Sequence, residues 1–364
     1  MPNHSRKRVM PAEWERHDAT WLAWPHHEDD WPGKFESIPW VMAEIVRRIA
    51  GADDAPRRGE RVEVLCNSPE HAAGVRDILE RAHAINDNVR LHVCPTDRSW
   101  LRDSAPSFVR TSDGAVEAVR WRFNAWAKYD NYAHDQRVPD FVAKTTGLPI
   151  AQATRPDNDQ PLVLEGGAID ANGDGVVLVT EECLLDQRTQ ARNPGLSRED
   201  YERAFARWLG AERTVWLGAG CVGDDTHGHI DDIARFVPPV GPLGEAGAET
   251  VLLAYEDDPA DDNHAASLEN EARLGDAGLH VVTVPYPQPV VFEGQRLPAS
   301  YANFYVCNAC VLVPTFNDPN DRVALNTIAD LFPDRPTIGV HCLDMVWGLG
   351  TIHCLTQQQP APVR

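Results

Sequence analysis

Apolar strand-like runs and amphipathic helical patterns alternate along most of this chain. Residues 61–66 have the composition of a strand, and Pro69 opens a helical pattern in which apolar residues recur through Ala82. The alternation continues with strands predicted at 89–93, 214–217, 251–254, 280–284 and 305–313, and helices at about 261–274 and 322–331. Taken alone, this pattern favours a doubly wound parallel sheet.

Four segments interrupt this pattern with small and polar residues that a core would not need. They span residues 100–106, 164–170, 224–232 and 348–359, and together they supply a thiol, imidazoles and several carboxylates. In the last segment a glycine-bracketed turn precedes Cys354, so we expect a loop to expose this cysteine to substrate as a nucleophile. The alternative is a small cysteine buried in the core.

The third segment predicts how two of these groups are placed. It runs into residues 233–237, whose β-branched and aromatic side chains are typical of a strand. If the extended conformation begins at His229, then His229 and Asp231 point to the same face, because strand side chains repeat every two residues. His229 would then act on a bound substrate while Asp231 holds it.

The four segments resemble those of the agmatine deiminases, in the guanidine-modifying superfamily that also includes Porphyromonas-type peptidylarginine deiminases. The resemblance covers nearly the whole chain, because further matching segments lie at residues 11–15, 19–25 and 300–305. It implies that Cys354 is the nucleophile, that His229 is the general acid and base, and that three carboxylates grip a guanidinium: Asp103, Glu165 and Asp231. Two departures affect loops: Leu349 stands where the family has glycine, and Ser104-Ala105-Pro106 replaces Thr-Gly-Pro.

The resemblance also implies the fold. In place of a doubly wound sheet, we expect the α/β pentein architecture, a five-bladed propeller of ββαβ-type units with pseudo-fivefold symmetry and the active site at its centre. One catalytic domain would span residues 1–364, with an ordered core at about 10–360. Such an arrangement explains why the candidate residues come from four distant segments.

The chemistry of a guanidinium matches these residue types. It is a planar cation with N–H donors in its plane, so paired carboxylates can bind it through charge-assisted hydrogen bonds. Its central carbon is a poor electrophile, which calls for a thiolate, and His229 can protonate the departing ammonia and then activate water. This reaction requires no cofactor and no metal.

Composition limits the partners. A formal net charge of −21 disfavours nucleic acid and anionic membranes and suits a small cationic guanidine, although acidity also keeps proteins soluble. The chain has no apolar run of about 18 residues that would span a membrane, and its basic first eight residues lack the apolar stretch of a secretory signal. We therefore predict a cytoplasmic protein with eight reduced cysteines, for which a homodimer or higher homo-oligomer is the candidate assembly.

Three other motifs have simpler explanations. Residues 170–181 match the EF-hand calcium pattern, but a strand-like run follows, so we expect a hairpin turn. Cys307 and Cys310 lie in an apparent strand, which would direct their thiols to opposite faces and exclude zinc binding or redox pairing. His353 would diverge from Cys354 in an extended segment, which favours His229 as the base; His227 is the stronger competitor.

The most favoured function is conversion of agmatine to N-carbamoylputrescine and ammonia through an amidino-cysteine intermediate. Trp100 is expected beside the site and Asp225 as a further substrate ligand. The main alternative is a deiminase of free or peptidyl arginine. The α-carboxylate of arginine would need a cation in the pocket, and among the four segments only the one with Arg102 brings a cation. A cysteine protease would not need three carboxylates, and an amine-binding protein without catalysis is the remaining class.

Overall fold

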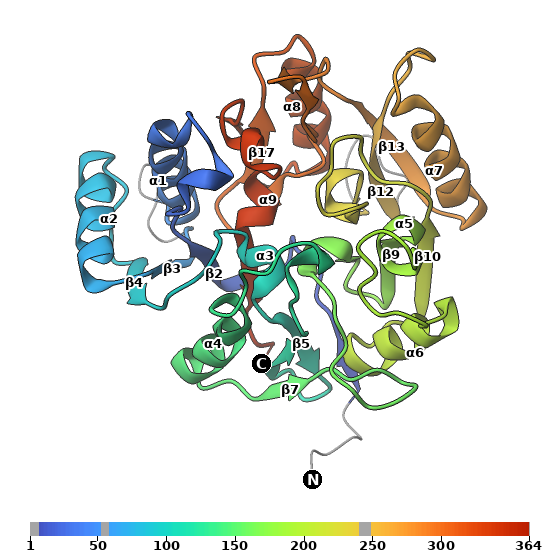
Figure 1. Ribbon diagram of the computed structural model, residues 1–364, viewed down its shortest axis with the longest axis horizontal. Coiled ribbons are helices and arrows are strands. Elements are labelled where there is room, and N and C mark those ends of the chain that lie inside the picture. Colours follow the sequence, from blue (N-terminus) through green and yellow to red (C-terminus); the bar gives the residue numbers. More distant parts are fainter. Residues whose placement is uncertain (1–6, 52–57, 240–248, 364) are drawn as a thin grey trace.

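The structure is a computed structural model that describes residues 7–51, 58–239 and 249–363. The expectation about a secretory signal concerns residues that lie mostly outside this description. The described chain has a mixed α/β fold whose sheets follow one another around a common centre, where the short helices α3 (Leu101–Ser104) and α9 (Ile352–Leu355) lie (Figure 1). Among the described residues, no helix combines the length and the apolar character needed to cross a membrane.

Five of the sheets in the described chain share one pairing pattern. In each, one strand pairs antiparallel with one neighbour and parallel with the other, and one or two helices connect the parallel pair. The first sheet has the order β19 (Thr356–Pro360), β2 (His17–Ala23), β3 (Arg61–Cys66) and β4 (Val89–Val93). The second has the order β1 (Arg8–Val9), β5 (Ser107–Thr111), β6 (Val116–Arg120) and β7 (Ile150–Gln152).

The other three sheets have three strands each. Their orders are β10 (Arg213–Leu217), β9 (Val176–Thr180) and β8 (Asp170–Ala171); β11 (Ala234–Val237), β12 (Thr250–Tyr255) and β13 (His280–Pro285); and β16 (Tyr305–Val306), β17 (Val311–Thr315) and β18 (Thr337–His341). A small hairpin adds β14 (Val291–Phe292) and β15 (Gln295–Arg296). The pairing is therefore not that of a doubly wound parallel sheet.

The longer helices lie outside the sheets in Figure 1, and the centre is left to loops and short helices. They are α1 (Ile38–Ile49), α2 (Pro69–Arg81), α4 (Val138–Thr146), α6 (Arg198–Trp208), α7 (His264–Asp276) and α8 (Asn320–Leu331). The short helix α5 (Glu181–Leu185) directly follows β9. Helix α2 illustrates the local signals: the Ser68 hydroxyl accepts the His71 N–H at 3.0 Å, and Pro69 occupies the first turn.

Most elements predicted from hydrophobic periodicity are confirmed, and two predictions are wrong. The run at 305–313 is not one strand, because β16 and β17 form a hairpin whose turn contains Cys307 and Cys310. Their sulfur atoms consequently lie 3.5 Å apart and do not point to opposite faces. Extended structure also does not begin at His229, because residues Ile230–Asp232 form a 3-10 turn before β11.

The EF-hand-like segment forms a hairpin between β8 and β9, as predicted. Asp170 is directed away from the turn: its Oδ1 accepts the Arg235 Nε–H at 3.1 Å, and its Oδ2 accepts the Phe236 N–H at 2.5 Å. Glu181 pairs with Arg198 and with Arg273. The first and twelfth positions of the calcium pattern therefore bind arginines and cannot converge on one ion.

This hairpin leads to the first prediction: calcium should leave the melting temperature unchanged. A site filled at one hundred times its dissociation constant would add about 2.7 kcal/mol to the free energy of unfolding. We would compare thermal denaturation in excess calcium and in chelator, with magnesium as the control for ionic effects. A rise of several degrees with calcium alone would contradict the assignment of a simple hairpin.

Candidate active site

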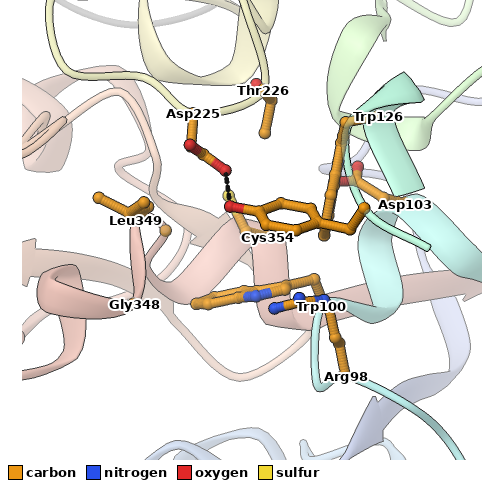
Figure 2. A pocket seen from close by; sticks show the side chains of 11 residues that line it. Arg98, Trp100, Asp103, Trp126, Asp225, Thr226, Gly348, Leu349 and Cys354 are labelled. Atoms are coloured by element: carbon orange, nitrogen blue, oxygen red, sulfur yellow. Dashed lines mark hydrogen bonds between the residues drawn. The ribbon is translucent and has the colours of Figure 1, made fainter. Parts of the chain in front are cut away.

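A pocket at the centre of the molecule has Cys354 among its lining residues. Figure 2 shows the indole rings of Trp100 and Trp126 and the carboxyl groups of Asp103 and Asp225 at this pocket. The full lining consists of Arg98, Trp100, Asp103, Trp126, Tyr129, Asp225, Thr226, Gly348, Leu349, Gly350 and Cys354. Aromatic walls with a few acidic groups are suited to a small cation that carries an apolar chain.

Cys354 lies in helix α9 and is 6% exposed, so the expectation of a loop-exposed thiol is wrong. The preceding turn still brings it to the pocket. A Cβ at Gly350 would lie 2.9 Å from the Trp100 ring and 3.2 Å from the Cys354 Cβ, so a side chain would not fit there. Leu349 adopts the left-handed conformation, with φ of 68°, and lines the pocket beside the thiol.

The thiol is surrounded by polar groups. Asn303 Nδ2 donates to Cys354 Sγ at 3.1 Å, and Asp231 Oδ2 lies 3.8 Å from the same sulfur. Burial and the negative charges of Asp231, Asp232 and Asp103 raise the pKa of Cys354 well above its ordinary value. The thiol is therefore protonated in the empty site, and a bound cation would lower this pKa.

His229 lies between carboxylates and is 1% exposed. Its Nε2 is 3.6 Å from Glu165 Oε2, and its Nδ1 is 3.9 Å from an oxygen of Asp103 and 3.9 Å from Asp231 Oδ1. Burial opposes the charge, but the charge of Asp103 and the interaction with Glu165 raise the pKa of His229 well above its usual value. Among the described residues, neither ring nitrogen has a partner within hydrogen-bond distance, and Nε2 faces the Glu165 carboxylate.

Asp103 is held by two donors. Its Oδ1 accepts the Gly167 N–H at 2.9 Å, and its Oδ2 accepts the Trp126 Nε1–H at 2.8 Å. Gly167 must lack a side chain, because a Cβ there would lie 2.5 Å from His229 Nδ1. Burial first, and then repulsion by Asp231 and Glu165, raises the pKa of Asp103 to about 6 despite the nearby His229.

Glu165 lies behind His229 and does not line the pocket. Arg192 Nε donates to its Oε1 at 3.2 Å, and both side chains are fully buried. Burial favours the neutral acid, but Arg192 and His229 lower the pKa of Glu165. Glu165 thus lies between Arg192 and His229, and its predicted contact with a guanidinium stays a prediction.

Asp231 lies deeper than Asp103 and is fully buried. His353 Nδ1 is 2.6 Å from its Oδ2, whereas its Oδ1 has no hydrogen-bond partner among the described residues. His353 belongs to helix α9, so the prediction that His353 and Cys354 lie in an extended segment is wrong. The adjacent Asp232 has a pKa raised well above its usual value by burial and by the charges of Asp231 and Asp224.

The remaining predicted residues separate into two groups. Trp100 and Asp225 both line the pocket; Tyr129 donates to Asp225 Oδ2 at 2.7 Å, and Lys128 pairs with the same carboxylate. His227 lies elsewhere, with Nε2 2.9 Å from Asp186 Oδ2.

The cation at the pocket comes from outside the four segments. Arg98 lines the pocket, whereas Arg102 turns inward, with its NH1 donating to Gln358 Oε1 at 2.6 Å. The segment that holds Arg102 therefore brings its positive charge beneath the pocket and not into it.

Several contributors were missed because only the fold brings them to the site. Glu13 and Asn303 lie in segments that support the family resemblance, which was the one available signal for them. Arg192 lies in a run with no strand or helix pattern, and nothing in its neighbourhood marked it. Glu165, Cys183 and His229 also lie close enough to contact one ion, but Arg192 already pairs with Glu165, so this group does not match an open metal site.

A buried thiol, a histidine and several carboxylates around one pocket, within a mixed α/β fold, define a cysteine-centred site for a cationic ligand. The sequence model described as Porphyromonas-type peptidyl-arginine deiminase matches residues 9–360, and this chain belongs to that family. Curated agmatine deiminases of Stutzerimonas stutzeri and Pseudomonas fluorescens are each 34% identical to it, over 97% and 99% of this chain and 95% and 99% of theirs. The resemblance predicted from the sequence is thus confirmed.

Solved structures agree over the same length. The agmatine deiminase of Enterococcus faecalis, in a structure described as catalyzing its reaction, is 28% identical with a TM-score of 0.84, over 98% of this chain and 97% of that one. A cysteine-to-serine variant of C. jejuni agmatine deiminase with substrate bound is 25% identical with a TM-score of 0.84, over 100% and 99% of the two chains.

The second prediction concerns Asp103 and the pH dependence of stability. Its pKa of about 6 in the fold exceeds the ordinary 3.8, so the empty protein binds this proton more tightly than the unfolded chain does. The resulting stability is present below about pH 4 and is lost as the pH rises through 6. The free energy of unfolding should therefore fall less from pH 4 to pH 7 in Asp103→Asn than in the wild type. The difference between the two decreases should be on the order of 3 kcal/mol.

Denaturant unfolding at both pH values measures this difference directly. The change with pH is the informative quantity, because an amide cannot accept from both Gly167 and Trp126 and will lower stability at every pH. Asp276→Asn, at the exposed end of α7, is the matched control. Equal pH dependence in Asp103→Asn and the wild type would show that Asp103 titrates normally in the fold.

Proposed function

We propose that this protein is an agmatine deiminase, which hydrolyses the guanidinium of agmatine to N-carbamoylputrescine and ammonia. The observation that carries the proposal is the buried Cys354 thiol, which lines the pocket together with Asp103 and lies 3.8 Å from Asp231. Asp231 Oδ1 has no hydrogen-bond partner among the described residues, and a planar cation beside the thiol would supply one. The names of the relatives support the same substrate.

Asp103 and Asp231 bind the guanidinium in this proposal. Asp231 Oδ1 is free to accept an N–H, and Asp103 would bind a second nitrogen from the side of Trp126. Glu165 instead keeps His229 charged and oriented, since Arg192 already occupies one of its oxygens. The cation offsets the repulsion among these carboxylates, which is the largest electrostatic gain that the site offers.

The bound cation also creates the nucleophile. With the carboxylate charges compensated, the pKa of Cys354 falls and its proton passes to solvent water, which later returns it to the released ammonia. The thiolate then forms a bond to the guanidinium carbon, and the C–N π electrons move to nitrogen, which gives a tetrahedral adduct. Asn303 Nδ2, already 3.1 Å from Sγ, stabilises the developing thiolate.

Two proton transfers by His229 complete the turnover. The imidazolium gives its proton to the departing nitrogen, and the C–N bond breaks to release ammonia and leave an amidino group on Cys354. Neutral His229 then takes a proton from water as the oxygen bonds to the amidino carbon. Collapse of that second adduct breaks the C–S bond, and the proton of its hydroxyl group passes to the departing sulfur, which releases the neutral ureido product and restores the thiol.

The outer pocket favours agmatine over arginine. Trp100, Trp126 and Tyr129 supply aromatic walls for the methylenes, and Asp225 can pair with the terminal ammonium. Arg98 could in principle attract an α-carboxylate, but it already pairs with Asp30 and lies 4.3 Å over the Tyr129 ring. The alternative of an arginine deiminase would require this pair to separate.

A cysteine protease is a poorer match to the same residues. Its tetrahedral intermediate carries an oxyanion, which calls for donors near the sulfur. Here the groups next to Cys354 include the carboxylates of Asp231 and Asp103, which would destabilise that charge. The site chemistry thus selects a cationic electrophile.

The wider predictions belong to the same proposal. We infer that the five similar sheets form the five blades of a pentein propeller with its pseudo-fivefold axis through the site, because each supplies the same antiparallel and parallel pairing. The chain would act as one catalytic domain in the cytoplasm, alone or as a homo-oligomer. The eight cysteines, all without disulfides, are compatible with a reducing compartment.

The third prediction tests the nucleophile. Cys354→Ser should lose turnover by several orders of magnitude and still bind agmatine, because a serine hydroxyl is a far weaker nucleophile. Ammonia release should be fastest from agmatine when agmatine, arginine and an arginyl peptide are compared. Intact-mass analysis of a quenched reaction should detect the amidino adduct on the wild type only. Cys342→Ser, at a buried cysteine away from the pocket, is the control, and substantial turnover by Cys354→Ser would refute the mechanism.

The fourth prediction tests recognition of the distal amine. Asp225→Asn should raise KM for agmatine about tenfold, which corresponds to one charge-assisted hydrogen bond. It should have little effect on butylguanidine, which lacks the amine. Lys128→Gln is the matched opposite change, because it removes the cation that competes for Asp225 and should lower KM for agmatine. Equal effects of Asp225→Asn on both substrates would place the amine elsewhere.

A further inference from the structure

His353 contacts two carboxylates through its two ring nitrogens. Nδ1 lies 2.6 Å from Asp231 Oδ2, and Nε2 lies 2.8 Å from Glu13 Oε2. The imidazole side chain is 2% exposed, so water does not separate these partners. It forms a direct bridge between the N-terminal segment that holds Glu13 and the carboxylate next to the reactive thiol.

Glu13 is itself fixed as an anion. Its Oε1 accepts the Val306 N–H at 2.8 Å, and its Oε2 lies 3.3 Å from Arg102 NH2 and 3.0 Å from Arg235 NH2. Burial alone would favour the neutral acid, but Arg235, His353 and Arg102 lower the pKa of Glu13 well below its ordinary value. Because an ionised carboxylate only accepts hydrogen bonds, the His353 nitrogen that faces it must donate.

The same reasoning applies to the other side of the ring. Burial would raise the pKa of Asp231, but even apart from His353 the charges of His229 and Arg235 act to lower it. Asp231 is thus a second anion that only accepts. A neutral imidazole has one donor and one acceptor nitrogen, so two acceptor partners require both nitrogens to carry protons.

We propose that Glu13 and His353 form a positioning pair for Asp231: the doubly protonated His353 ring holds Asp231 Oδ2 and leaves Oδ1 free for the guanidinium. This role rests on the proposed function, because it concerns how the substrate cation is gripped. Among the described residues Oδ1 is buried without a hydrogen-bond partner, as an oxygen reserved for a ligand would be. His353 thus acts through Asp231 and does not contact the reacting atoms.

The charges around Asp231 explain why a fixed cation is useful there. The titratable or charged groups that face it are His353 and Cys354 from α9, Asp232 from the 3-10 turn, His229 before it, Arg235 from β11 and Asp103 from α3. Three of these groups are acids, namely Asp103, Asp232 and the Cys354 thiol. Without His353, Asp231 would compete with Asp103 and Asp232 for a proton in the empty site.

Two substitutions of His353 separate its donors. The amide nitrogen of asparagine takes the place of Nδ1, so His353→Asn keeps a donor to Asp231; that of glutamine takes the place of Nε2, so His353→Gln keeps only the donor to Glu13. We expect His353→Gln to lower kcat/KM for agmatine about ten- to a hundredfold, mainly through KM, and His353→Asn to lower it less. Equal losses in both variants would overturn the proposal.

The pH profile distinguishes positioning from a merely structural role. Asp231 must be ionised to bind the cation, and losing the His353 donor raises its pKa. The acid limb of kcat/KM should therefore move to higher pH in His353→Gln and move less in His353→Asn. A lower melting temperature with an unmoved acid limb would show that His353 only supports the fold.

A measurement without substrate keeps this test independent of the proposed function. In protein labelled with nitrogen-15 at histidine, the signals of the His353 ring are identified by their absence from both variants. In the wild type these signals should show both ring nitrogens protonated near neutral pH. If the wild type released no ammonia from agmatine, the proposed function would fail while the ring result would still decide the protonation of His353. An unprotonated ring nitrogen at His353 would overturn the positioning pair directly.

Discussion

Burial of several carboxylates around one thiol is the constraint that organises this structure. An isolated charge in a protein interior is very costly, so each acidic group needs a cation or must hold a proton. Arg192 compensates Glu165, and Arg235 with His353 compensates Asp231. For Asp103 the balance fails and its pKa rises to about 6. The charge that would complete the balance is the one a guanidinium brings.

The charged groups of this balance come from distant parts of the chain. Glu13 precedes β2, Arg102 belongs to α3, Arg235 to β11 and His353 to α9, and all four meet beneath the pocket. Removing one partner of such a buried network costs about 3–5 kcal/mol, since the remaining charge stays buried and unpaired. The network therefore ties the N-terminal segment, two other parts of the fold and the helix of the reactive cysteine to one geometry.

This dependence on distant partners explains which features the sequence could predict. Periodicity identified β3, α2 and β13 because their signals are local, and segments of small and polar residues identified Cys354, His229 and Asp103 as groups of interest. The partner of each group is set by packing, and no spacing rule reveals that Arg192 faces Glu165 or that Arg102 turns from the pocket to Glu13. Local geometry also failed where a short turn replaced a strand, at residues 230–232 and at 307–310.

The balance of charge also gives the resting protein a chemical advantage. A thiol reacts with oxidants and electrophiles as its thiolate, and the carboxylates around Cys354 keep it protonated while the pocket is empty. In the proposed reaction the guanidinium is both the electrophile and the charge that allows the thiolate to form. A neutral electrophile of the same size would lack the second property, so the carboxylates that bind the substrate also decide which molecules the cysteine can attack.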